Sequence, residues 1–499
     1  MRPYVIVRVV PLVRYLVERR DRAILGLVSV PILTRMFSPS QYGVYSLMAV
    51  TIMLVAPLFY ITFVMSTIRY FPEYNDKNEL DTLYSTALHY TPHFLLVVLG
   101  ICLPVAAFAL PLGTNRGLRC LGIAVFALIV PFFILLTFLQ VHYRARAYAI
   151  LFLLMHAGRY LVGATLVKWA GTGVNGVFIA WLGALLIVIP MELVILRVHD
   201  RFHWYKYSPG LMKKFYNYGS VLVVTSVFAN ILTSSDRYLV QAFRGSREVG
   251  LYSVVYTLAV DAFTMILSAL QLGTAPVVIQ TYESEGEQAT VDLLSRITRY
   301  LLLTLIPLTI GIFLLRERVI HVLTSAKYVP AQTAVLPLAL GIFFYNLTLM
   351  PMYAFYVKKR TRLTLVPVII SAVLNVGINL ILIPRYGFVG AAWSTMIAYT
   401  GYLVILIIMS EKLMHWKFPV LDVLKLVAAG AVMGVAVYFL NKIPVRGIGG
   451  LVIAALGGAI VYIAALFVFK GVTPSELKFA RQTIGNLVSK AEPPSTEDE

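Results

Sequence analysis

The chain has little charge and almost no cysteine. Of its 499 residues 13% are charged and 59% are hydrophobic, whereas an ordinary soluble domain has about 25% charged residues. So few charged side chains cannot form the polar shell that a soluble protein of this size needs. The two cysteines, Cys102 and Cys120, lie in or beside apolar runs, so we expect neither a disulfide framework nor a metal site. The sequence therefore predicts a protein whose main solvent is the lipid bilayer.

The sequence also lacks the features of a nucleotide-binding protein. It contains no G-x-x-x-x-G-K-[ST] run, the motif whose backbone cradles nucleotide phosphates. Its longest polar connections, near 197–216 and 276–298, are too short for a nucleotide-binding domain. Because no connection is large enough for a catalytic domain either, we expect no enzyme activity. We expect no cofactor, although coupling to an ion gradient of Na+ or H+ remains open.

Long apolar runs are what the chain has in abundance. A membrane-spanning helix needs about 20 mostly apolar residues, and fourteen stretches meet this requirement. The expected fold is an all-α polytopic membrane protein with about 14 transmembrane helices. The stretches are 14–37, 41–66, 85–110, 119–140, 147–168, 174–196, 217–243, 249–275, 299–316, 333–355, 363–383, 387–409, 419–440 and 448–469.

The net charge of +19 has an explanation in the loops. Lys and Arg gather in the connections that share a side with the N-terminus, and cytoplasmic loops of membrane proteins carry such an excess. We therefore predict a multi-pass protein of the cell (cytoplasmic or inner) membrane with both termini in the cytoplasm. Nucleic acid is not an expected partner.

Two pairs of short, similar segments indicate an internal repeat. Gly43 and Gly250 open similar segments, YGVYS and VGLYS, and the turn GVNGV at 173–177 resembles GFVGA at 387–391. The offsets, 207 and 214 residues, are nearly equal. A repeat of six spans preserves orientation, so we expect two six-helix lobes around a central cleft, related by an axis along the membrane normal. The predicted organisation is a first lobe at 1–207, a second at 208–411, two extra C-terminal helices within 412–472, and a cytoplasmic tail at 473–499.

Several segments together resemble a known family. NVGINLILIPRYGFVGAAWST at 375–395 is similar to its N-x-x-x-N-x-x-x-I-P-x-x-G-x-x-G-A-A-x-x-T signature, and PILTRMFSPSQYGVY at 31–45 resembles its opening. RYFPEY at 69–74, and SDRY at 235–238 followed by VGLYS, match its spacing. The chain thus resembles, over about residues 14–410, the polysaccharide (O-antigen type) lipid-linked oligosaccharide flippases of the multidrug/oligosaccharidyl-lipid/polysaccharide exporter superfamily. Unlike its usual members, this chain has a dense charged cluster at 18–22.

Arginines inside the spans are the candidate substrate-binding residues, since each costs about 2.5–3.5 kcal/mol on insertion scales and needs a cavity or a partner. Arg159 falls near mid-membrane; it either lines a cavity for an anionic substrate or bonds to backbone or to a neighbouring span's hydroxyl. Arg19 and Arg22 share a helix face, which would place two cations at an inner mouth. Glu18 could instead neutralise Arg22 in a solvated cluster.

Other polar residues fall in the spans of the second half. Arg237 is a further substrate-binding candidate near the outer leaflet, and Asp236 and Asp261 are candidates for gating or ion coupling. Because neighbours in a helix do not face each other, we expect Asp236 and Arg237 to need separate partners, with Asp261 the suggested partner of Arg237. An inter-helix ion pair without a transport role is the alternative. Asn375 and Asn379, one turn apart, are expected to join helices through hydrogen bonds.

The resemblance implies a flippase that moves a polyprenyl-(di)phosphate-linked oligosaccharide from the cytoplasmic to the outer leaflet by alternating access, for cell-surface glycan biosynthesis. Membrane lipids are expected partners, and a glycan polymerase or glycosyltransferases of the same pathway are possible ones. A cation-coupled multidrug extruder of the same superfamily is the nearest alternative, although the basic interior disfavours it. A membrane-embedded glycan polymerase or ligase would need a large outer loop, which is missing. A scaffold that recruits glycosyltransferases would leave the intramembrane charges without use.

Overall fold

The computed structural model describes residues 26, 28–102, 115–415, 418–445 and 447–471. These residues form helices joined by short turns, and no strand occurs among them. The first half contains α2 (Pro39–Asp76), α3 (Leu80–Val97) with a π-helical end η1 (Val98–Cys102), α5 (Arg116–Val141), α6 (Ala145–Ala157), the π turn η2 (Gly158–Val162), α7 (Gly163–Ala170) and α8 (Val174–Leu196). The short α9 (Val198–Arg201) and η3 (Trp204–Lys206) follow.

The second half begins with three long helices. These are α10 (Pro209–Arg244), α11 (Ser246–Glu285) and α12 (Glu287–Leu314). The remaining elements are α13 (Arg316–Leu323), η4 (Ala326–Ala334), α14 (Val335–Leu347), α15 (Leu349–Val357), η5 (Thr361–Thr364), α16 (Leu365–Glu411), α17 (Val420–Leu440) and α18 (Gly447–Val468).

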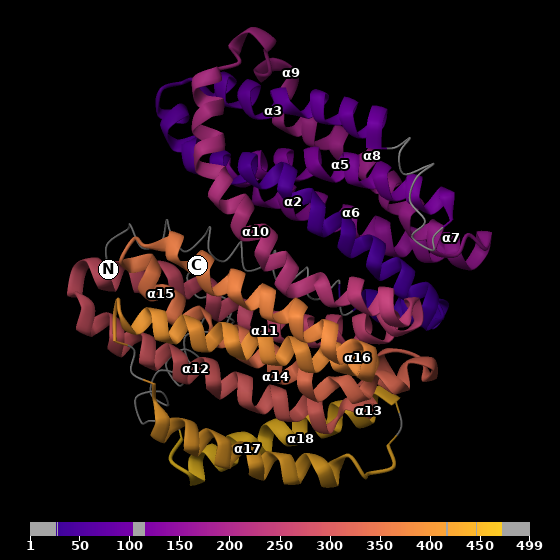
Figure 1. The fold of residues 1–499 in the computed structure, drawn as a ribbon, viewed down its shortest axis with the longest axis vertical. Helices are drawn as coiled ribbons and strands as arrows, with labels where there is room; N and C mark the ends of the chain where they lie inside the picture. The colour runs from indigo at the N-terminus through magenta and orange to yellow at the C-terminus, as the bar shows by residue number, and fades with distance from the viewer. Residues whose placement is uncertain (1–25, 27, 103–114, 416–417, 446, 472–499) are drawn as a thin grey trace, which may run out of the picture.

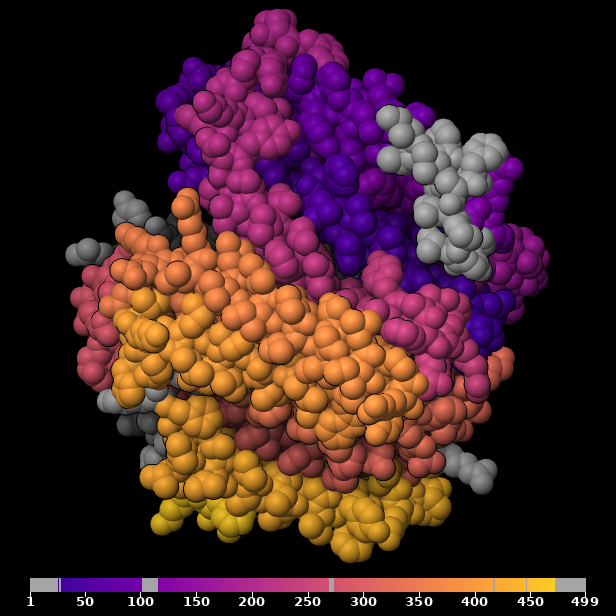
Figure 2. Space-filling model, viewed as in Figure 1, coloured from indigo at the N-terminus to yellow at the C-terminus, as the bar shows by residue number. Residues whose placement is uncertain are grey.

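The helices form two lobes and an attached pair. Figure 1 shows α2, α3 and α5–α8 in one lobe and α11–α16 in the other, with α10 running between them. The pair α17 and α18 covers the side of the second lobe that faces away from the first (Figures 1 and 2). The two-lobed, all-helical fold with two extra C-terminal helices is therefore confirmed.

The predicted spans have clear counterparts. Within the described residues, eleven helical segments are long and apolar enough to cross a membrane. They cover twelve of the fourteen predicted spans, because the segment 361–411 contains two of them. The predicted spans 14–37 and 85–110 lie partly outside the described residues. The protein is thus a multi-pass membrane protein.

The element α16 is a hairpin of two helices. Gly387 interrupts it with φ 59° and ψ −142°, a conformation that L side chains rarely adopt. The Ser394 hydroxyl donates to the carbonyl of Asn375 at 3.1 Å, although these residues would be about 28 Å apart along a straight helix. The chain therefore turns back at Gly387 and places the two halves of α16 side by side.

The two halves repeat each other in backbone conformation. Gly173, which precedes α8, has φ 57° and ψ −143°, nearly the values of Gly387 at the matching turn. Gly43 of α2 and Gly250 of α11 meet across the lobes: a Cβ on Gly43 would lie 1.8 Å from the Ser246 carbonyl oxygen, and one on Gly250 would lie 1.9 Å from that of Pro39. The matching positions thus face each other where the lobes join.

Helix α10 contacts both lobes. Near its start, the ring of Phe215 stacks on Tyr70 of α2 with centroids 6.0 Å apart. Near its end, the Ser235 hydroxyl donates to the Asn375 side chain of α16 at 2.9 Å. The segment after 208 therefore begins against the first lobe and ends within the second. The residue boundaries expected for the lobes and the tail stay predictions.

Candidate functional site: two buried charged clusters

Two of the four predicted substrate-binding arginines are placed by the structure. Arg159 is 5% exposed and Arg237 is 4% exposed, one in each lobe. Arg19 and Arg22 lie outside the described residues. The substrate-binding role of all four stays a prediction.

Aromatic side chains enclose Arg159. Its guanidinium carbon lies 3.5 Å from the ring centroid of Trp181, 5.0 Å from that of Tyr160 and 5.5 Å from that of Tyr45. One guanidinium nitrogen donates to the Tyr45 hydroxyl at 2.7 Å. Cation–π contact is strongest with Trp and grows when water is excluded. Among the described residues no carboxylate pairs with this arginine, so the rings and a hydroxyl of another helix hold its charge.

The local sequence explains this close packing. Arg159 lies in the π turn η2 between α6 and α7, a distortion that often accompanies functional sites. Glycines flank the turn: a Cβ on Gly158 would lie 3.0 Å from the Ala184 methyl group, and one on Gly163 would lie 3.1 Å from the Val177 backbone. These small residues let α6 and α7 approach α8, which brings Arg159 onto Trp181.

The second cluster is centred on Asp236 of α10, which is 1% exposed. One carboxylate oxygen accepts the Arg237 backbone N–H at 2.8 Å. The other accepts hydrogen bonds from the hydroxyls of Tyr252 and Thr395, the latter at 3.4 Å. Two helices of the second lobe, α11 and α16, thus each supply a hydroxyl to this carboxylate.

The side chains of Asp236 and Arg237 form an ion pair with each other, at 3.6 Å between nitrogen and oxygen. The expectation that each needs a separate partner was therefore wrong. The pair forms because the Arg237 side chain turns along the helix and donates to the Thr233 carbonyl at 3.2 Å. Its guanidinium carbon also lies 4.3 Å from the ring centroid of Tyr256.

Asp261 is not the partner of Arg237 in this structure. Arg237 lies seven residues from the end of α10 and Asp261 lies fifteen residues from the adjacent start of α11, which correspond to depths of about 10 and 22 Å. One Asp261 oxygen is buried and has no hydrogen-bond partner among the described residues. It faces Gly26, where a Cβ would lie 2.0 Å away. A gating or coupling role for Asp261 stays a prediction.

Asn375 and Asn379, in the first half of the α16 hairpin, are both buried. The Asn379 amide donates to the Asn375 side-chain oxygen at 3.0 Å, the oxygen that also accepts from Ser235. The Asn375 amide nitrogen and the Asn379 oxygen are buried without further partners among the described residues. The pair thus links α10 to α16 through Ser235, the residue before Asp236 in the chain.

Two members of these clusters and one buried acid were not among the sequence-predicted site residues. Tyr45 and Tyr252 occupy matching places two residues after Gly43 and Gly250, and each bonds to a buried charged side chain. Their shared G-x-Y spacing was the available signal. Glu192 of α8 is 0% exposed and has no hydrogen-bond partner for either oxygen among the described residues. Its signal was a single carboxylate inside an apolar run.

Comparison with known proteins agrees with this architecture. Residues 22–281 match the family described as polysaccharide biosynthesis protein. The probable low-salt glycan biosynthesis flippase Agl15 of Haloferax volcanii is 22% identical over 272 residues, which are 53% of this chain and 56% of that protein. The probable lipid II flippase MurJ of Thermotoga maritima is 25% identical over 307 residues, which are 60% of this chain and 59% of that protein. The chain thus spans about half to three fifths of the curated relatives that it matches.

Solved structures share the fold over a longer range. The lipid II flippase MurJ in an inward closed conformation superposes with a TM-score of 0.74 at 16% identity and covers 92% of this chain and 98% of its own. An inward-facing multidrug resistance transporter of the MATE family superposes with a TM-score of 0.57 at 15% identity and covers 80% of this chain and 94% of its own. Both likenesses show the fold.

Proposed function

Because the chain belongs to the polysaccharide biosynthesis protein family, we propose that it is a flippase for a polyprenyl-(di)phosphate-linked oligosaccharide. The substrate moves from the cytoplasmic to the outer leaflet, and both termini lie in the cytoplasm. The related proteins named as flippases support the proposal. A diphosphate and a glycan cannot cross hydrocarbon unaided, so the carrier must offer them charge and hydrogen bonds inside the membrane.

The observation that carries the proposal is the Arg159 guanidinium, buried in the first lobe without a carboxylate partner among the described residues. Tyr45 comes from α2 and Trp181 from α8, so the cation is held between two helices. Separation of these helices would expose a cation with unused donors to the substrate phosphates, and return of the rings would release the substrate. Arg237 differs, because Asp236 already balances its charge.

The polar cluster around Asp236 is the proposed place of ion coupling. Its oxygens come from α10, α11 and α16, and oxygen donors suit both a hard cation and a proton relay. A cation or proton that binds Asp236 would compete with Arg237 for the same carboxylate and so would change how α10 is held. Replacement of Na+ by choline, and separately collapse of the pH gradient, would identify the ion by the loss of transport.

The function is tested with purified protein in liposomes that contain a polyprenyl diphosphate bearing N-acetylglucosamine. A membrane-impermeant lectin measures how fast the sugar reaches the opposite leaflet. We expect wild type and Arg159→Lys to expose the sugar faster than protein-free liposomes do, and Arg159→Glu to abolish this gain. Size-exclusion profiles of all variants verify folding, and Arg159→Gln gives a variant without charge at this position.

Two outcomes would contradict the proposal. Sugar exposure at the protein-free rate would exclude the flippase. Dye efflux from loaded cells that express the protein would then favour a multidrug extruder. Transport at the wild-type rate by Arg159→Glu would exclude the role of this guanidinium.

A further inference from the structure

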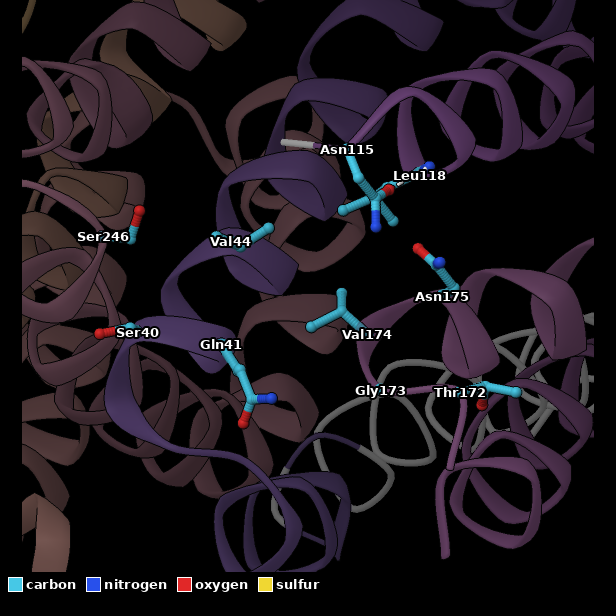
Figure 3. A pocket seen from close by; sticks show the side chains of 10 residues that line it. All are labelled: Ser40, Gln41, Val44, Asn115, Leu118, Thr172, Gly173, Val174, Asn175 and Ser246. Carbon is cyan, nitrogen blue, oxygen red and sulfur yellow. Dashed lines mark hydrogen bonds between the residues drawn. The ribbon is translucent and has the colours of Figure 1, made fainter. Parts of the chain in front are cut away.

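A cavity of about 390 Å³ lies on the first lobe where several helices begin. Ser40 and Gln41 of α2, Asn115 before α5, and Asn175 of α8 line it, together with Ser246 of α11 (Figure 3). None of the described side chains that line it is ionisable. Its volume is within the range of small-molecule sites, about 300–1,000 Å³. The orientation predicted above places it on the outer face of the membrane.

The cavity presents hydrogen-bond donors. The Asn115 side-chain oxygen accepts the Leu118 N–H at 2.8 Å, and the Gln41 oxygen accepts the Ser38 N–H at 3.0 Å. Among the described residues, neither amide has a hydrogen-bond partner for its NH2 group. Val174 is the first residue of α8, so its N–H has no acceptor within its own helix. The starts of four helices add partial positive charge at this place.

The second lobe shows what such a turn binds. By the repeat, Gln41 corresponds to Glu248, since each stands two residues before the matching glycine. The Gly173–Val174 turn corresponds to Gly387–Phe388 and has the same backbone conformation. In the second lobe, a Glu248 carboxylate oxygen accepts the Phe388 N–H at 2.9 Å. The chain thus fills this site with its own carboxylate in one lobe.

Among the described residues, the first lobe has no carboxylate at this turn. Gln41 forms a capping box with Ser38 and stays on its own helix, and the cavity occupies the space beside Gly173 and Val174. We propose that this cavity binds the carboxylate of an external ligand at the Val174 N–H, in the position that Glu248 holds in the second lobe. The ligand is either an acidic sugar of a glycan or a free small carboxylate. The site itself does not depend on the flippase activity.

Binding to the full-length protein in detergent is measured by saturation-transfer NMR with glucuronate, acetate and glucose. We expect wild type to bind the two carboxylates and not glucose. Gln41→Glu should weaken binding at least tenfold, because its own carboxylate would fill the site as Glu248 does. Val174→Pro should do the same by removing the N–H, and proline is well tolerated at the first position of a helix.

Gln280→Glu is the matched control, since it makes the same chemical change on an exposed position of α11 and should bind as wild type does. Tighter binding of glucuronate than of acetate identifies an acidic sugar, and equal binding identifies a free carboxylate. The proposal is overturned if wild type binds neither carboxylate, if glucose binds as well, or if both cavity variants bind normally. The sugar of the transport substrate, N-acetylglucosamine, has no carboxylate. Lectin-detected transport of that substrate by Gln41→Glu would therefore leave the proposed function standing in each case.

Discussion

The contact between Gly43 and Gly250 allows the sharpest test of the fold. Replacement of Gly43 by Ala places a Cβ 1.8 Å from the Ser246 carbonyl oxygen, and ordinary van der Waals contact begins near 3.4 Å. Helices α2 and α11 must therefore separate by about 1.6 Å, and the neighbour cannot rotate away because it is backbone. Overpacking of this kind costs about 1–3 kcal/mol, whereas the better helix propensity of Ala returns about 0.5–1 kcal/mol.

We therefore expect Gly43→Ala to lower the free energy of unfolding by about 1–2 kcal/mol, measured by thermal unfolding of the detergent-purified protein through tryptophan fluorescence. Gly250→Ala should have a similar effect. The double variant should lose less than the sum, because one separation of the helices accommodates both methyl groups. Gly183→Ala is the control: it lies within α8 and its Cβ would meet nothing within 4 Å. An unfolding temperature of Gly43→Ala equal to that of Gly183→Ala would refute the close contact.

Three further substitutions test the buried charges, each read by the same unfolding measurement. Tyr45→Phe should cost about 1–3 kcal/mol because one donor of Arg159 loses its acceptor in a dry site, and a wild-type value would mean that the aromatic rings alone hold the cation. Asp236→Asn should cost about 3–5 kcal/mol because it leaves Arg237 charged and unpaired, whereas a smaller loss would show that the hydroxyls and rings carry the site. Glu192→Gln should be at least as stable as wild type, since it removes an ionisable group that has no partner among the described residues; a clear loss would reveal a bonded carboxylate.

The helical elements of this chain could be predicted from its sequence better than the contacts between them. Apolar length is a local property, so the spans could be counted before their packing was known. Side-chain pairing depends also on side-chain conformation and on the packing of helices. Asp236 and Arg237 were expected to point apart from helix geometry, yet the long arginine side chain reaches back along the helix to the carboxylate. Asp261 was suggested as the partner of Arg237, and only the placement of α10 beside α11 shows that the two residues lie at different depths.

The internal repeat, too, was partly visible in the sequence and partly visible only in the structure. The similar segments at Gly43 and Gly250, and at Gly173 and Gly387, were visible in the sequence because turns and close approaches select glycine. That the first pair meets across the lobes became visible only in the structure.

By itself, the sequence determined that this chain lies in a membrane, that it is helical, and that it is built from two similar halves. The length of the apolar runs and the glycines at turns are local properties of the sequence, and backbone groups inside hydrocarbon must form their hydrogen bonds within a helix. The tertiary structure decided how each buried charge is held. It gave Arg159 aromatic rings and a hydroxyl, gave Asp236 hydroxyls from α11 and α16, and left a donor-lined cavity where the second lobe has Glu248. Those partners lie far apart along the chain, so only the packing of helices could bring them together.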